Sequence, residues 1–261
     1  LSMRANYELT KRFTAEFSIR PFITRYPKRT LALLRKWTKD PSDDVRRLVS
    51  EGTRPRLPWA PRLPEFQKDP GPVLGLLEEL KDDPALYVRR SVANNLNDIG
   101  KDHPELLVET AAAWMKDADE NRAWLIRHAL RSAVKRGDVG ALRVLGYGDA
   151  KGLIVEAAAI APALARIGDK ITVAFNVTNK GRQGRPVMVD FRIHYVKANG
   201  STSPKVFKLK AIEIGPGDSV RVQKKVSVAD MTTRKHYAGL HQVDAILNGE
   251  VKPIGSFNLS R

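Results

Sequence analysis

Cysteine is absent from the 261 residues of this chain, and its absence excludes several kinds of protein. Disulfide bonds, thiolate zinc sites, iron–sulfur clusters and cysteine nucleophiles all require this residue. No apolar stretch approaches the ~18–20 residues that a membrane-spanning helix needs. The first residues, Leu1-Ser2-Met3-Arg4, lack both a signal region and an initiator methionine, so we expect the chain to begin inside a longer protein.

Several motifs that carry well-known chemistry are also missing. The sequence has no P-loop, no glycine fingerprint of a dinucleotide-binding fold, no His-Glu-x-x-His pair and no nucleophile elbow. The spacing of its five histidines does not demand a metal ion. We therefore expect a protein with no bound metal and no cofactor.

Acidic residues are few relative to basic ones. The chain has 45 Lys and Arg against 29 Asp and Glu, which gives a formal net charge of +16. Such a surplus favours a polyanionic partner, because phosphate contacts release counterions. Ribosomal proteins, membrane-surface proteins and simply soluble basic proteins share this property, so the charge favours nucleic acid without proving it.

The composition changes along the chain and indicates two domains. Residues 1–147 are dense in Leu, Ala, Arg, Trp and Asp-Pro steps, whereas residues 153–261 are rich in Val, Ile, Thr, Lys and Gly with alternating polarity. The glycine-rich stretch 146–152 between them is typical of a linker. The sequence thus predicts an α + β two-domain protein, helical over 1–147 and β-stranded over 153–261.

The helical part contains an internal repeat. Asp, Pro, Val, Arg and Arg recur at the same spacing in Asp40–Leu48 and Asp83–Ser91, 43 residues apart, and a looser copy begins at Lys116. Periods of ~40–47 residues built from helix pairs are typical of HEAT- and armadillo-like solenoids. We expect each Asp to be the N-cap of a helix and each Pro to lie in its first turn.

The second part has the pattern of a β-sandwich. Polarity alternates with period two over 170–177, 187–195 and 220–228, and the run 242–247 ends at Asn248-Gly249, a hairpin signal. About seven short strands over this length are typical of an immunoglobulin-like sandwich. A cysteine pair and a central Trp are missing, so the domain is not of the antibody type.

The repeat predicts a stripe of charged side chains across adjacent helices. Arg47 and Glu51 are four residues apart and share a face. Their equivalents in the next copy are Arg90 and Asn94, with Asp98 one turn further along. In the looser copy the same face continues with His128, Arg131 and Lys135. Solvated salt bridges would explain any one pair, whereas the stripe as a whole favours a binding face.

Two other stretches contain candidate site residues. Trp59 lies in a proline-interrupted loop together with Arg54 and Arg56, where it could stack on a sugar or a base or could cover the core between two repeats. Glu16 lies in an aromatic-rich stretch with Arg20 one turn on. It is either a plain salt-bridge partner of Arg20 or a catalytic carboxylate held by Arg20.

Taken together, these stretches resemble the AlkC branch of the AlkC/AlkD-type DNA glycosylases, bacterial proteins with HEAT-like repeats. The resemblance covers most of residues 13–147, and its most specific part is the run Ser-Glu-Gly-Thr-Arg-Pro-Arg-Leu-Pro-Trp over 50–59. The other matching segments are Glu16–Phe22, Tyr87–Asp98 and Trp124–Arg131. Some members of this branch carry a C-terminal immunoglobulin-like domain, and members usually begin with further helical repeats, which this chain lacks.

The resemblance implies a function and roles for individual residues. The family excises cationic N-alkylated bases, chiefly 3-methyladenine and, in the AlkC branch, 3-methylcytosine, by hydrolysing the N-glycosidic bond as the first step of base-excision repair. Glu16, Glu51 and Asp98 match the acidic catalytic cluster, and Trp59 matches the active-site aromatic residue. The expected DNA-binding residues of the helical domain are Arg47, Arg54, Arg56, Arg90, Arg127, His128, Arg131 and Lys135.

The chemistry agrees with these residue types. An alkylated cationic base is already an activated leaving group, so carboxylates need only stabilise the oxocarbenium sugar and position a water. No Lys nucleophile is required, so we expect a monofunctional enzyme without lyase activity. The family precedent favours hydrolysis of a base that stays stacked over one that is flipped into a pocket.

The β domain is expected to act as a DNA clamp, because it carries the larger share of the positive charge. Its candidate contacts form two turn clusters, which are Lys180, Arg182 and Arg185 in one and Arg234 and Lys235 in the other. The alternative for each cluster is a solvated loop.

The expected partner is double-stranded DNA containing alkylated bases, bound by a monomer in the bacterial cytoplasm at the nucleoid. Two rival functions stay open. One is a non-catalytic scaffold that binds nucleic acid or protein, against which the retained acidic residues argue. The other is an RNA-binding accessory factor, because charge alone does not distinguish RNA from DNA.

Overall fold

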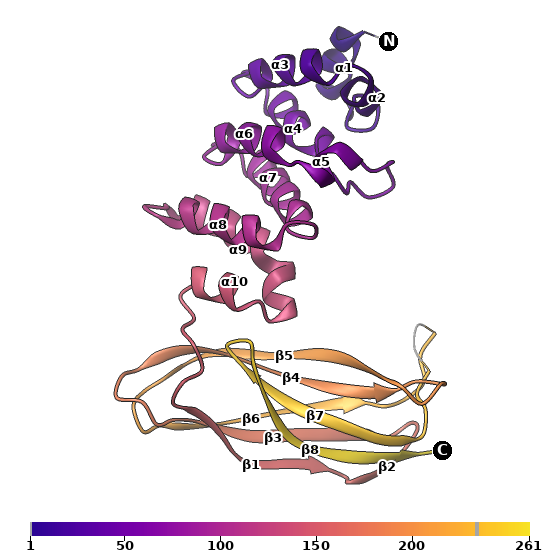
Figure 1. Cartoon of the computed structure of the whole chain (residues 1–261), viewed down its shortest axis with the longest axis vertical. Helices are drawn as coiled ribbons and strands as arrows, with labels where there is room; N and C mark the ends of the chain where they lie inside the picture. The colour runs from indigo at the N-terminus through magenta and orange to yellow at the C-terminus, as the bar shows by residue number, and fades with distance from the viewer. Residues whose placement is uncertain (1, 233–234) are drawn as a thin grey trace. The chain divides into compact units, whose positions relative to one another are not determined.

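The computed structural model describes residues 2–232 and 235–261, and it contains a helical part followed by a β-stranded part (Figure 1). Contacts between Cα positions divide the chain into two compact units, Leu1–Ala133 and Val134–Arg261. The predicted α + β organisation is confirmed at this level. No helix in the described part of the chain is long and apolar enough to cross a membrane.

The helices are short and often begin at proline, which is tolerated in a first turn because the N–H it lacks would have no partner there. Five of them have Pro at the first or second position. The helices are α1 (Met3–Thr10), α2 (Arg20–Arg25), α3 (Pro27–Trp37), α4 (Asp43–Gly52), α5 (Pro64–Lys68), α6 (Gly71–Leu80), α7 (Leu86–Ile99), α8 (Pro104–Met115), α9 (Glu120–Arg136) and α10 (Val139–Val144).

The first unit is built in layers. Helix α4 packs on α3 and α7, and α7 in turn packs on α6 and α8, so each layer covers the apolar face of the next (Figure 1). The interface between α4 and α7 contains fully buried aliphatic side chains, including Val45, Leu48, Val92 and Leu96. Burying such side chains in a shared core is what stabilises a stack of helix pairs.

The repeated Asp-Pro steps lie just before helices α4 and α7, and the prediction that each Asp is the N-cap is wrong. The N-caps are Ser42 and Ala85. Asp40 and Asp83 instead accept a hydrogen bond from the backbone N–H two residues on, each at 2.9 Å. The prediction that each Pro lies in the first turn is also wrong, because Pro41 and Pro84 precede the N-caps and the Asp turn closes before the helix begins.

The first Arg of each Val-Arg-Arg copy is a structural residue. Arg46 donates to the carbonyls of Asp40 and Pro41 and forms a two-point ion pair with Asp83 of the next repeat, the shorter contact being 2.6 Å. Arg89 donates to the carbonyls of Asp83 and Pro84 in the same way. The recurrence in sequence therefore corresponds to a recurrence in the hydrogen bonds to the Asp-Pro carbonyls. Toward the next layer, Arg46 pairs with Asp83, and Arg89 donates to Oδ1 of Asn121 at 2.8 Å.

The second unit is a sandwich of two sheets. A three-stranded sheet has the order β1-β3-β6 and a five-stranded sheet the order β2-β8-β7-β4-β5, with β2 and β8 parallel and the other pairs antiparallel. The strands are β1 (Leu153–Ala161), β2 (Leu164–Arg166), β3 (Lys170–Asn179), β4 (Arg185–Val196), β5 (Thr202–Ile214), β6 (Ser219–Ser227), β7 (Gly239–Leu247) and β8 (Glu250–Ser260).

The core of the sandwich lies between the inner faces of the two sheets. Phe175, Phe191 and Phe257 are fully buried there among valines of β3, β4 and β7. The predicted strands over 170–177, 187–195, 220–228 and 242–247 match β3, β4, β6 and β7. Asn248 and Gly249 form the predicted turn between β7 and β8, both with positive φ, as a tight hairpin turn of this type requires.

The boundary between the units differs from the expected one at 147–153. Helix α10 and the last residues of α9 group with the strands. Lys208 of β5 donates to the carbonyl of Val134, and Asn248 donates to the carbonyl of Gly148 at 2.9 Å. The composition of the sequence changes where helices give way to strands, near residue 150. The compact units divide earlier, because α10 and the end of α9 make their contacts with the strands.

Candidate active site

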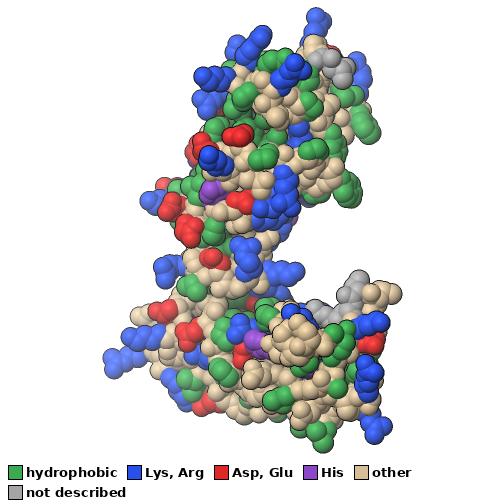
Figure 2. Space-filling model, turned by 45° about the vertical axis from the view of Figure 1, so that its right-hand side comes forward, with side chains coloured by type: hydrophobic (Ala, Val, Ile, Leu, Met, Phe, Trp, Pro, Cys, Tyr) green, Lys and Arg blue, Asp and Glu red, His purple; other side chains and the backbone are tan. Residues whose placement is uncertain are grey.

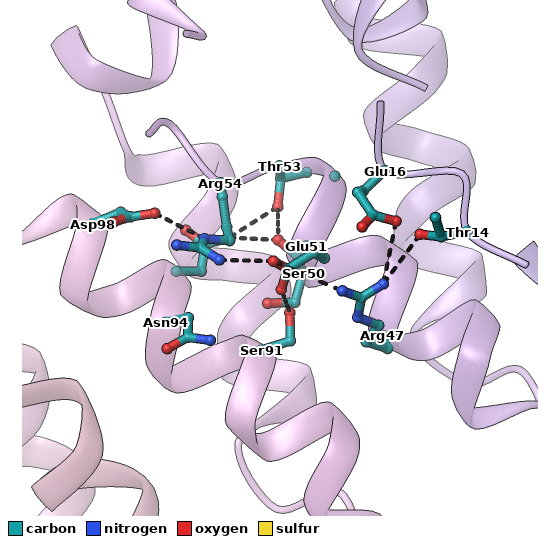
Figure 3. A network of polar contacts seen from close by, with 12 residues as sticks. Thr14, Glu16, Arg47, Ser50, Glu51, Thr53, Arg54, Ser91, Asn94 and Asp98 are labelled. Atoms are coloured by element: carbon teal, nitrogen blue, oxygen red, sulfur yellow. Dashed lines mark hydrogen bonds and ion pairs between the residues drawn. The ribbon is translucent and has the colours of Figure 1, made fainter. Parts of the chain in front are cut away.

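The three acidic residues expected at the site lie in one network on the helical unit (Figure 3). Glu16 comes from the segment before α2, Glu51 from the last turn of α4, and Asp98 from the last turn of α7. Arginines alternate with them, so each carboxylate is joined to the next through a guanidinium group.

Glu51 is the central carboxylate of this network. Its Oε1 atom accepts from Nη1 of Arg54 at 2.7 Å and lies 3.8 Å from Nη2 of Arg47. Its Oε2 atom accepts a hydrogen bond of 2.6 Å from the hydroxyl of Ser91 on α7. Both oxygens are therefore held, and the residue is buried.

Asp98 is buried still more deeply, with 2% of its side chain exposed. Its Oδ2 atom accepts from Nε of Arg54 at 2.8 Å, and its Oδ1 atom from Nζ of Lys101 at 2.7 Å. The two partners differ, because the Arg54 side chain is 10% exposed and that of Lys101 is 42% exposed. Lys101, which the sequence did not indicate, is the most accessible cation that touches the network.

Glu16 pairs with Arg47 rather than with Arg20, so the expected partner is wrong, while the catalytic role of Glu16 stays a prediction. Nη1 of Arg47 lies 3.2 Å from Oε2 of Glu16 and also donates to the hydroxyl of Thr14. The guanidinium group of Arg47 lies over the ring of Tyr87, 5.1 Å from its centroid. Spacing along one helix suggested the wrong partner, since the true one comes from the next layer.

Arg20 instead organises the loop that follows α4. Its buried guanidinium group donates to the carbonyls of Gly52, Arg54 and Pro61 at distances between 2.6 and 3.1 Å. Burial, with a contribution from the charge of Arg54, lowers the pKa of Arg20 to about 10. Sequence reasoning missed this role, because carbonyl groups leave no signal in a sequence.

The burial of Arg54 corrects its expected role as a DNA contact. Its side chain lies between Glu51 and Asp98 and is not free to meet a phosphate. Burial alone would lower the pKa of Arg54, but the neighbouring charges of Glu51 and Asp98 raise it above its usual value. Arg47 is likewise held by two carboxylates, and Arg56 forms a two-point ion pair with Asp102.

Other expected DNA contacts lie on the surface. Arg90 and Arg127 are exposed, and within the described residues neither forms a hydrogen bond or an ion pair. Arg131 and Nε2 of His128 both donate to the Oδ1 atom of Asn94, at 2.9 and 3.1 Å. Figure 2 shows Lys and Arg side chains over much of the visible face of this unit.

His128 has a distinct environment within this group. Its ring stacks on that of Trp124, with centroids 5.2 Å apart and planes within 6°. Partial burial lowers the pKa of His128 below its usual value, and the charges of Arg131 and Arg90 lower it further. The imidazole is therefore neutral at pH 7 and donates through Nε2 to the amide oxygen of Asn94.

Trp59 is 98% exposed, so the interpretation that it covers the core between repeats is wrong. Its φ of 62° lies in the left-handed region, which costs energy for a bulky residue. Pro58 and Pro61 flank it, and Arg20 fixes the carbonyl of Pro61. The loop that follows α4 thus presents an aromatic ring to solvent.

The second unit has its own basic residues. Arg182, Lys235 and, at the end of α9, Lys135 are exposed, and Lys180 lies 3.9 Å from Glu156. Arg185 is held by the carbonyl of Lys151 and by Asp149. Arg182 and Arg185 line a pocket of about 500 Å³ together with four glycines. Arg234 lies outside the described residues, so its predicted role stays a prediction.

No group of three His, Asp or Glu side chains in the described ranges could hold a metal ion. Each carboxylate of the network has a cationic partner instead, namely Arg47, Arg54 or Lys101. Such an arrangement can stabilise positive charge if a partner moves away, and it can hold a water at a carboxylate oxygen.

Comparison with known proteins agrees with this architecture. Residues 154–261 match the family described as the C-terminal Ig-like domain of the uncharacterised protein YhaZ. The chain is 40% identical to YhaZ of Bacillus subtilis over 251 residues, which is 96% of this chain and 70% of that protein. It is 42% identical to the structure of Pseudomonas fluorescens alkylpurine DNA glycosylase AlkC bound to DNA containing an abasic site analog, over 99% of this chain and 72% of that one, with a TM-score of 0.89.

The fold and the site thus define a two-domain protein with an acidic, arginine-linked cluster on a helical unit and an immunoglobulin-like C-terminal domain. The chain belongs to the family of AlkC-type DNA glycosylases, as its sequence predicted.

Proposed function

We propose that this protein is a DNA glycosylase that starts base-excision repair. It hydrolyses the N-glycosidic bond of cationic alkylated bases, 3-methyladenine and 3-methylcytosine, in duplex DNA. The observation that carries the proposal is the network of Glu16, Glu51 and Asp98, whose carboxylates are the groups that this reaction needs. Trp59, in the loop that follows α4, exposes the aromatic ring that the proposed function also uses. The relationship to AlkC supports it.

The proposed reaction requires carboxylates for two purposes. A base with a positive charge leaves without help from a strong acid, so the enzyme has to stabilise the oxocarbenium sugar that remains. Buried carboxylates stabilise such a charge well, because the protein surroundings screen it less than water does. Asp98 is suited to hold the attacking water, since the partner of its Oδ1 atom is the exposed Lys101.

The helical unit also has the surface that DNA binding needs. The contacts of Arg46 with Asp83 and of Arg89 with Asn121 in the next layer support a HEAT-like solenoid, whose equivalent helix positions line one face. Arg90, Arg127 and Arg131 are exposed on that unit and can meet phosphates. The basic Ig-like unit is proposed to clamp the duplex, and the enzyme to act as a cytoplasmic monomer without lyase activity.

Release of alkylated base from methylated duplex DNA tests the proposal. We expect the wild-type protein to release 3-methyladenine or 3-methylcytosine, and Glu51→Gln and Asp98→Asn to lower the rate at least about 100-fold. Undamaged duplex DNA should bind all three proteins with similar affinity. A folded wild-type protein that binds DNA but releases no base would contradict the proposal.

One observation favours a second function. Every carboxylate of the network has a cationic partner, which is also the arrangement of a purely structural cluster. The protein would then be a scaffold that binds nucleic acid without catalysis. Loss of thermal stability in Glu51→Gln and Asp98→Asn, without any base release by the wild type, would support this alternative.

A further inference from the structure

Arg54 is the only side chain in the described part of the network that touches both Glu51 and Asp98. Its Nη1 atom lies 2.7 Å from Glu51 and its Nε atom 2.8 Å from Asp98, so one planar group spans two carboxylates from successive layers. The planar fork of a guanidinium group suits such bridging, whereas a lysine offers a single point charge.

The position of Arg54 is itself fixed from the backbone. Its carbonyl accepts a hydrogen bond of 2.9 Å from the buried Arg20, and its N–H donates to the carbonyl of Glu51. A side chain that serves as a phosphate contact keeps its charged end in solvent. Arg54 has its end inside the protein, so its charge acts on the two carboxylates.

The charge of Arg54 has a consequence for the protonation of its partners. Two buried carboxylates close together repel each other, and burial disfavours their charged forms, so a cation between them favours the charged form of both. A protonated Asp98 or Glu51 could neither stabilise an oxocarbenium sugar nor accept a proton from water. The bridge by Arg54 therefore favours the charged forms of Glu51 and Asp98, which the proposed reaction uses.

Other groups also face this pair and set its protonation together with Arg54. They come from every element packed around the pair. They are Glu16 before α2, Arg20 at the start of α2, Arg47 on α4, Arg56 in the loop after α4, Tyr87 on α7, Lys101 after α7 and Arg131 on α9. Arg54 differs from all of these in contacting both carboxylates.

We infer that Arg54 is a positioning residue, whose guanidinium group fixes Glu51 and Asp98 relative to each other and favours the charged form of both. This inference rests on the proposed glycosylase function. It assigns Arg54 a part in the reaction that a phosphate contact or a simple structural bridge would not have.

The test measures single-turnover base release from methylated duplex DNA between pH 5 and pH 9. We expect Arg54→Met to be about 10-fold slower at pH 7, mainly because the two carboxylates lose their shared partner, and to regain part of this loss at higher pH, because removal of a nearby positive charge moves its acidic limb upward. Arg54→Lys should fall between Arg54→Met and the wild type, since an ammonium group replaces the charge but not the bridge. A pH profile with an unshifted acidic limb in both variants would overturn the inference.

Arg46→Met is the matched control. Arg46 also forms a buried arginine–carboxylate pair between two layers, but its partner is Asp83, outside the network. We expect this variant to lose stability while the pH profile of base release keeps its acidic limb in place. An equal shift in Arg46→Met would show that a general loss of stability moves the limb, and would count against Arg54.

A second measurement does not depend on activity. Carboxyl ¹³C chemical shifts of Glu51 and Asp98, followed by NMR against pH, give their protonation directly. In Arg54→Met at least one of the two should titrate at a higher pH than in the wild type, because a nearby positive charge has been removed. If the wild type releases no base but this shift occurs, the proposed function fails while the effect of Arg54 on its partners stands. If base release occurs and neither group shifts, the inference fails alone.

Discussion

Two neighbouring layers of the helical unit use the same repeat for different purposes. In the layer of α4, Arg47 and Glu51 belong to the acidic network, and both are largely buried. At the equivalent positions of α7, Arg90 is exposed and Asn94 is a neutral acceptor for Arg131 and His128. The structural arginines Arg46 and Arg89, by contrast, make equivalent hydrogen bonds.

The difference shows how a repeat protein separates stability from function. The position that links the layers keeps its residue type and its hydrogen bonds to the Asp-Pro carbonyls, although its partner in the next layer changes from Asp83 to Asn121. The positions of Arg47 and Glu51 differ from their equivalents in burial and charge, so α4 places an ion pair in the network where α7 has the exposed Arg90 and the neutral Asn94. Each of the following predictions changes one side of this comparison.

The largest effect is expected when α4 is given the residue that α7 has at the equivalent position. Glu51→Asn places the residue type of position 94 at position 51 and removes the charge that pairs with Arg54. We expect base release to slow by at least about 100-fold, with little change in affinity for undamaged DNA. Single-turnover kinetics and fluorescence anisotropy check this. Activity within a few-fold of the wild type would show that the charge at this position is dispensable.

The arginine that links two layers, Arg46, should contribute more to the free energy of unfolding than an exposed arginine does. Arg46→Met leaves the carboxylate of Asp83 buried without its partner, which we expect to lower the free energy of unfolding by about 3 kcal/mol. Urea denaturation followed by circular dichroism measures it. Arg35→Met removes a more exposed ion pair with Glu79 and should cost below about 1 kcal/mol. Equal losses in the two variants would mean that burial does not decide the value of the pair.

The exposed arginines of α7 and α9 should contribute to DNA affinity rather than to the chemical step. Replacing both Arg90 and Arg127 by Met is expected to weaken binding to undamaged duplex DNA several-fold and to reduce its salt dependence by about one unit of slope per arginine. Arg35→Met serves as a control with one charge removed elsewhere. An unchanged slope in the double variant would exclude these residues as phosphate contacts.

The smallest effect concerns His128. Because its folded-state pKa is lowered, the unfolded chain binds a proton more readily. The contribution of His128 to stability is therefore complete above about pH 6.5 and is lost as the pH falls below that value. Proton NMR of the imidazole should give a pKa below 6.5 in the wild type. Arg131→Met should raise it, and a pKa that stays the same or falls would contradict the electrostatic explanation.

Much of the site could be predicted from the sequence because it depends on residue types in a recurring frame. The three carboxylates and the cations on α7 and α9 follow from the repeat and from the family resemblance, whereas the sequence left open whether Trp59 is exposed. The pairing of these groups could not be predicted. Glu16 was expected beside Arg20, and Arg54 was expected at the surface, because helical spacing describes neighbours on one helix and says nothing of the next layer.

The sequence by itself determined the order of a helical part and a β part, the 43-residue repeat, the strands β3, β4, β6 and β7, and the Asn248-Gly249 turn. These features depend on local periodicity and on turn residues, which short segments already contain. Only the tertiary structure decided that Arg54 bridges Glu51 and Asp98, that Arg20 binds carbonyl groups and that α10 belongs with the strands. Such contacts join residues far apart in the chain, and they form because burial leaves a charged group stable only where it has a partner.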